Sequence, residues 1–131
     1  MDIAKLKFIG ILHSDIKDFE DAPKNFDESN KTGTLEIYPE YQGGLDGIEN
    51  GQTIVVIFWL HKANREILNV YPRGDQSREL RGVFATRSPV RPNPLAISEL
   101  KVLSLENNII EVAGLDILDG TPIADIKKKI S

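Results

Sequence analysis

Arginines and prolines are interleaved in one short segment, residues 81–98, a pattern typical of a rigid anion-binding loop. The arginines are Arg81, Arg87 and Arg91, and the prolines are Pro89, Pro92 and Pro94. A guanidinium stays charged and can form paired hydrogen bonds with a carboxylate or a phosphate. Because each proline fixes φ and lacks an N–H, no helix or central strand is expected here. This proline loop would hold an anion at little ordering cost, and an ordinary surface connection with solvated arginines is the alternative.

Two other patches combine polar side chains with backbone features that suit a ligand. His61 and Lys62 directly follow an apolar run at residues 54–60, and strand ends at a barrel mouth are open to ligands. A plain polar end to that strand is equally consistent with the pattern. In residues 115–122, Gly120 permits positive φ, and the Asp119 carboxylate can accept hydrogen bonds from ribose hydroxyls or an ammonium group. A simple hairpin turn is the alternative for this patch.

Composition and charge exclude several classes of function. The 131-residue chain has a net charge of −4, which argues against nucleic-acid binding by bulk electrostatics. Residues 61–98 nevertheless hold 7 basic and 3 acidic side chains, so a local anion site in an acidic protein is expected. Without cysteine there is no disulfide or thiolate chemistry, and two histidines do not favour a zinc site. Glycine-rich nucleotide motifs and a nucleophile elbow are also absent from the sequence.

Short apolar segments separated by turn residues predict an all-β fold, either a barrel or a sandwich. Strands are expected at residues 5–12, 34–38, 54–60, 82–86, 95–105 and 109–115. The seven apolar residues 54–60 predict a strand that is buried on both faces. A loop is expected at 13–31, one helical turn at 45–49 and a tail at 123–130. Neither a signal peptide nor a membrane span is expected at the amino terminus.

Residues 8–14, 58–63, 82–94 and 115–127 together resemble the TsaA-like, or TrmO, family over nearly the whole chain. The resemblance implies one antiparallel β-barrel domain over residues 1–131, with one or two short helices and no Rossmann fold. It further implies a cytoplasmic homodimer that binds S-adenosylmethionine. The activity implied is methylation of N6 of the threonylcarbamoyl-adenosine beside the anticodon of tRNA.

The same resemblance implies which residues form the site. The cofactor contacts are Pro23, His61, Lys62, Arg87, Ile97, Leu118, Asp119, Gly120 and Thr121. We expect Arg87 to bind the methionine carboxylate, and His61 is the candidate proton acceptor. The residues expected to contact RNA phosphates or the threonylcarbamoyl carboxylate are Arg78, Arg81, Arg91 and Asn93. No metal is expected.

The sequence also departs from the family pattern at several positions. Lys24 stands where the family often has arginine, so it keeps the charge and loses the bidentate fork. Leu95 and Ala96 replace a usual Ile-Gly, and Lys128 replaces a usual proline. The carboxyl-terminal region of bacterial members is not expected here. A non-catalytic barrel that binds a small anionic ligand, with a regulatory or scaffolding role, is therefore the alternative function.

Overall fold

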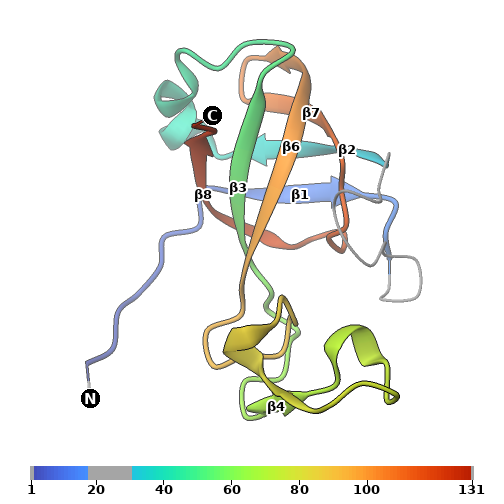
Figure 1. Ribbon diagram of the computed structural model, residues 1–131. Coiled ribbons are helices and arrows are strands. Elements are labelled where there is room, and N and C mark those ends of the chain that lie inside the picture. The colour runs from blue at the N-terminus through green and yellow to red at the C-terminus, as the bar shows by residue number, and fades with distance from the viewer. Residues whose placement is uncertain (1, 18–30, 131) are drawn as a thin grey trace.

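Six strands within the described residues, 2–17 and 31–130, close into a barrel in the computed structural model (Figure 1). Their order around the barrel is β1-β2-β7-β6-β3-β8, and every neighbouring pair is antiparallel. The strands are β1 (Gly10–Ser14), β2 (Thr32–Ile37), β3 (Thr53–Trp59), β6 (Leu95–Glu106), β7 (Ile109–Ala113) and β8 (Pro122–Lys128). The prediction of an all-β, non-Rossmann fold is confirmed.

Alternation along β3 places one of its faces in the core of the barrel. Ile54, Val56 and Phe58 are at most 1% exposed, whereas the side chains between them are only half-buried. The prediction that this strand is buried on both faces is wrong. Burial on both faces needs a second layer of structure, and in this barrel the apolar side chains of β3 that face outward are covered only in part.

The carboxyl-terminal segment is a strand and not the predicted tail. β8 pairs with β1 on one side and β3 on the other, and these pairings close the barrel. Ile123 is fully buried, but it is the only side chain of β8 that is. The apolar alternation that would reveal a strand is therefore weak in this sequence.

The first strand lies later in the chain than expected, at Gly10–Ser14 instead of residues 5–12. Gly10 pairs with Ile37 of β2, and a side chain at Gly10 would collide with the carbonyl oxygen of Glu36. Gly10 therefore permits the close approach of β1 and β2. The expected strand at 34–38 is confirmed as β2, and the strands at 95–105 and 109–115 are confirmed as β6 and β7 with shifted ends.

Short 3-10 helices occur at both ends of the barrel. η2 (Pro39–Leu45) begins with its proline in the first turn, which tolerates a missing N–H, and it places Leu45 in the core. The helical turn is thus not at residues 45–49 as predicted. No helix in the described part of the chain is both long and apolar enough to cross a membrane.

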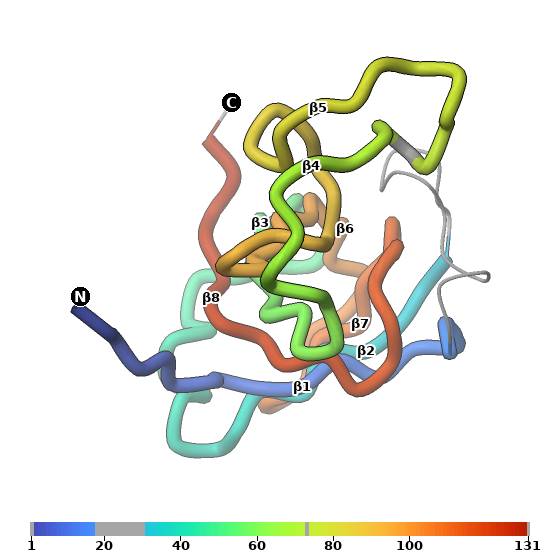
Figure 2. Tube along the Cα trace, turned by 90° about the horizontal axis from the view of Figure 1, so that it is seen from below, coloured from blue at the N-terminus to red at the C-terminus, as the bar shows by residue number. Residues whose placement is uncertain are grey.

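The segment between β3 and β6, residues 60–94, forms an extension that projects beyond one end of the barrel (Figure 1). Figure 2 shows the same extension in front of that end when the molecule is viewed from below. Its regular elements are β4 (Asn69–Val70), η3 (Pro72–Gly74), β5 (Arg81–Gly82) and η4 (Val83–Ala85). The predicted strand at 82–86 is wrong, because the chain turns into η4 at Val83, whose carbonyl accepts the N–H of Thr86.

Candidate functional site

The three patches predicted from the sequence adjoin neighbouring strands at one end of the barrel. Trp59, the last residue of β3, is paired with Leu95, the first residue of β6. Phe58 is paired with Ile123 near the start of β8. The His61–Lys62 pair follows β3, the proline loop leads into β6, and the turn Leu118–Thr121 leads into β8. Strand pairing therefore gathers segments that lie far apart in the sequence.

Hydrogen bonds inside the proline loop hold its irregular backbone in place. Arg91 donates from Nη1 to the carbonyl oxygens of Thr86 and Ser88, at 3.2 and 2.9 Å. The Ser88 N–H donates to Oγ1 of Thr86 at 3.1 Å. Arg65 anchors the loop from outside, because its Nε donates to the Pro92 carbonyl at 2.6 Å and its Nη2 donates to Oδ1 of Asn93 at 3.3 Å. Arg91 and Asn93, which we expected to contact RNA, thus have partners within the extension.

Arg87 lies at an edge of β6 that no strand covers. Pairing between β6 and β7 begins only at Lys101, so the first half of β6 is paired on its β3 side alone. Nη2 of Arg87 donates to the carbonyl oxygen of Ile97 on this edge, at 2.9 Å. A guanidinium has five N–H donors, and this is the one side-chain hydrogen bond of Arg87 in the described part of the chain. The two predicted cofactor residues Arg87 and Ile97 are therefore in contact, and donors remain for an anion.

Asp116 is a further candidate residue that the sequence analysis does not single out. Its half-buried carboxylate lies near Arg87 and accepts a long hydrogen bond, 3.4 Å, from Oγ of Ser98. Burial raises the pKa of Asp116, while the bond from Ser98, a bond from the backbone N–H of Asp116 itself and the charge of Arg87 oppose that rise. In the sequence it is marked only by belonging to the motif at residues 115–127, in which Asp119 is the carboxylate predicted to bind a ligand. Asp116 adds a negative charge beside the cationic Arg87.

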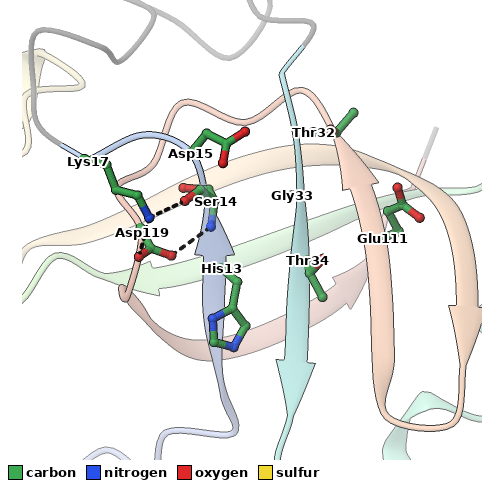
Figure 3. Close-up of a pocket in the computed structure, with 9 residues that line it drawn as sticks. All are labelled: His13, Ser14, Asp15, Lys17, Thr32, Gly33, Thr34, Glu111 and Asp119. Atoms are coloured by element: carbon green, nitrogen blue, oxygen red, sulfur yellow. Dashed lines mark hydrogen bonds and ion pairs between the residues drawn. The ribbon is translucent and has the colours of Figure 1, made fainter.

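Asp119 joins the turn before β8 to the end of β1, as Figure 3 shows. Its Oδ1 accepts the backbone N–H of Ser14 at 2.9 Å, and its Oδ2 accepts Nζ of Lys17 at 3.0 Å. These two donors hold the pKa of Asp119 below its usual range. An open polar groove of about 420 Å³ lies over β1 and β2 beside this carboxylate. The carboxylate predicted to hold ribose or an amino group thus also ties the turn to β1.

The turn from Leu118 to Thr121 has the backbone that the sequence predicted. Gly120 has φ of 82°, in the left-handed region that favours glycine. Oγ1 of Thr121 donates to the Leu118 carbonyl at 2.7 Å, and the side chain of Leu118 packs against the core. The turn therefore presents a fixed backbone at this end of the barrel.

The remaining predicted site residues are exposed or lie outside the described residues. His61 and Lys62 are exposed where the chain leaves β3, and the His61 N–H donates to the Trp59 carbonyl. Arg78 pairs with Asp75 at 3.5 Å and Arg81 pairs with Glu79 at 2.7 Å, both within the extension. Pro23 lies outside the described residues. In the described ranges no three histidine or carboxylate side chains gather in a way that would hold a metal ion.

Comparisons with known proteins point to one family. The family model described as the tRNA-methyltransferase O N-terminal domain matches residues 11–131. An S-adenosyl-L-methionine-binding protein of Archaeoglobus fulgidus is 45% identical over 123 residues, which cover 94% of this chain and 87% of that protein. A probable S-adenosyl-L-methionine-binding protein of the same organism is 44% identical over 97% of this chain, but this is only 34% of its own length.

A comparison with solved structures indicates the same family as the family model. The crystal structure of TrmO from Pseudomonas aeruginosa superposes with a TM-score of 0.78 at 28% sequence identity. The match covers 98% of this chain and 57% of that one. The chain thus spans little more than half of the TrmO structure and about a third of the second Archaeoglobus relative.

Proposed function

The chain belongs to the tRNA-methyltransferase O family. From this membership we propose that it is an S-adenosylmethionine-dependent methyltransferase. Its proposed substrate is tRNA, which it would methylate on N6 of the threonylcarbamoyl-adenosine in the anticodon loop. The observation that carries the proposal is the family match over residues 11–131. The gathering of the proline loop, His61–Lys62 and Leu118–Thr121 at one barrel end supports it. A cytoplasmic location goes with this substrate.

The residues at this end fit the charges of the cofactor. Arg87 keeps N–H donors beyond its single bond to Ile97, and these suit the methionine carboxylate. The exposed His61 and Lys62 and the turn at Leu118–Thr121 would line the rest of the pocket. When bound, S-adenosylmethionine supplies an electrophilic methyl group on a sulfonium.

The chain's own part in the reaction is mainly positioning. A nitrogen acceptor held in line with the methyl carbon needs little acid or base help, and orientation alone can contribute several powers of ten. The acceptor nitrogen loses its proton when the new C–N bond forms. His61, exposed at the end of β3, is the group we propose to take that proton.

The extension is the proposed RNA-binding part. Residues 61–98 carry 7 basic and 3 acidic side chains, whereas the whole chain has a net charge of −4. Phosphates would therefore be attracted to the extension and repelled by the rest of the molecule. Within the described residues, the exposed guanidiniums of Arg78 and Arg81 form their ion pairs with exposed carboxylates, and such pairs are weak enough for RNA phosphates to replace.

We also propose that two copies associate through the outer face of β3 and β6. Leu95 and Ile97 are 42% and 51% exposed, and Ile97 is paired with the half-buried Ile57. This apolar strip on paired strands is a surface that a second copy would cover. Sedimentation of the protein should give the mass of a dimer, and the mass of a single chain would contradict this arrangement.

A second function is favoured by one specific observation. The Archaeoglobus relative that the chain covers most fully is named a binding protein and not a methyltransferase. A barrel that binds S-adenosylmethionine without transferring its methyl group is therefore the competing proposal.

A methyl-transfer assay with RNA distinguishes the methyltransferase from the binding protein. The protein is incubated with methyl-labelled S-adenosylmethionine and with tRNA that carries or lacks threonylcarbamoyl-adenosine. We expect label only in the tRNA that carries it, on the N6 position as located by mass analysis. Cofactor binding without label in either tRNA would contradict the methyltransferase proposal and support a protein that only binds S-adenosylmethionine.

A further inference from the structure

Asp116 differs from the other carboxylates in the described ranges. Those that form ion pairs do so with an exposed cation, such as Lys17 for Asp119 or Lys129 for Glu99. Asp116 is half-buried, and its one side-chain donor is the buried hydroxyl of Ser98 at the long distance of 3.4 Å. The backbone N–H of Asp116 itself is a second donor, but a carboxylate can accept several hydrogen bonds, so Asp116 keeps the capacity for a further partner.

Arg87 is near Asp116 without forming an ion pair with it. The charge of Arg87 acts on the carboxyl group of Asp116, yet within the described residues the guanidinium makes its hydrogen bond to the Ile97 carbonyl instead. Both groups lie at the uncovered edge of β6, where Ser98 and Ile97 are consecutive. A cation and an anion thus lie near each other along one strand edge, each with capacity for a further partner.

This arrangement is complementary to the amino-acid end of the proposed cofactor. An α-carboxylate and an α-ammonium group are attached to the same carbon atom, so they require an anchored cation and an anchored anion close together. We propose that Asp116 binds the α-ammonium group of S-adenosylmethionine while Arg87 binds its α-carboxylate. The inference rests on the proposed function and assigns a binding role to a residue that is not among the site residues expected from the sequence or from the family resemblance.

Asp116→Asn is the variant that tests this assignment. Asparagine keeps the shape and the acceptor for Ser98 but removes the charge, and it should not destabilise the fold because burial already disfavours that charge. Glu106→Gln, at the exposed far end of β6, is a control with the same change in charge. The thermal unfolding midpoint of each variant shows whether it is folded.

Calorimetry with three ligands gives the readout. S-adenosylmethionine and S-adenosylhomocysteine both carry the amino-acid end, whereas methylthioadenosine lacks it. We expect Asp116→Asn to weaken the binding of S-adenosylmethionine and of S-adenosylhomocysteine by the same factor, about tenfold or more, because a charged hydrogen bond is lost. The affinity for methylthioadenosine should not change, and Glu106→Gln should change none of the three.

Each other result overturns the assignment. A loss for S-adenosylmethionine alone would place Asp116 against the sulfonium, and an equal loss for all three ligands would make its role structural or adenosine-binding. Unchanged affinities would remove Asp116 from the site. If the unaltered protein binds none of the three ligands, the proposed function itself fails, and that outcome is distinct from a failure seen only in the variant.

Discussion

Arginines of the extension differ in what their guanidinium groups contact. Arg91 donates to carbonyls of its own loop, and Arg65 lies over the Trp59 ring at 5.1 Å while it donates to the Pro92 carbonyl. Arg87 makes one side-chain hydrogen bond to the described residues, at the uncovered edge of β6. Residue type alone does not distinguish these roles, because each arginine has the same charge and the same fork. Arg91 therefore acts on the shape of the loop, and Arg87 is available to a ligand.

Replacing Arg91 by glutamine should therefore destabilise the protein. It removes two hydrogen bonds from a charged donor to partly buried carbonyls, at a cost of about 1–2 kcal/mol. Denaturant unfolding measures the change. Arg78→Gln is the control, because in the described part of the chain Arg78 pairs with the exposed Asp75 alone, and its loss should stay within about 0.5 kcal/mol. Unchanged stability of Arg91→Gln combined with weaker RNA binding would support the direct RNA contact predicted from the sequence.

Asp119 should make stability depend on acid pH. The Ser14 N–H and Lys17 lower its pKa in the folded protein below the unfolded value of about 3.9. A lowered carboxyl pKa contributes stability above the unfolded value, and that contribution is lost as pH falls through the folded one. Asp119→Asn should thus unfold at a lower temperature than the unaltered protein at neutral pH, and the gap should close in strong acid. A gap that persists at all pH values would contradict this role.

Strands in which apolar and polar side chains alternate clearly could be predicted from the sequence, and strands without that alternation could not. β2, β3, β6 and β7 each place alternate side chains in the core. β8 has one fully buried side chain followed by lysines, so only its pairing with β1 and β3 makes it a strand. The candidate site residues were predicted from motifs, and Asp116 is not among them because its setting depends on where β6 and β7 stop pairing.

The closing strand β8 is held in the core by one side chain, Ile123. Ile123→Ala should destabilise the barrel by about 2–5 kcal/mol, because Ile123 is fully buried between its partners Gly10 and Phe58. Ile130→Ala is the matched control, since Ile130 is 88% exposed and should change stability by less than about 0.5 kcal/mol. Equal effects of the two substitutions in denaturant unfolding would show that β8 does not close the core.

In the whole molecule, the basic side chains and the exposed apolar strip lie on different surfaces. The basic extension projects from one end of an otherwise acidic barrel (Figure 1). The apolar strip of β3 and β6 lies on the barrel wall that leads into the extension. RNA on the extension and a second copy on the strip would therefore occupy adjoining surfaces, with Arg87 and Asp116 at the barrel edge close to both.

Calorimetric titration of the protein with S-adenosylmethionine measures whether it binds the proposed cofactor. We predict saturable binding that Arg87→Ala weakens by about tenfold or more, because the cofactor's carboxylate would lose its cation. Arg87 donates to a backbone carbonyl at an exposed edge, so the variant should remain folded, and its unfolding curve checks this. The absence of binding to the unaltered protein at millimolar cofactor would contradict the account.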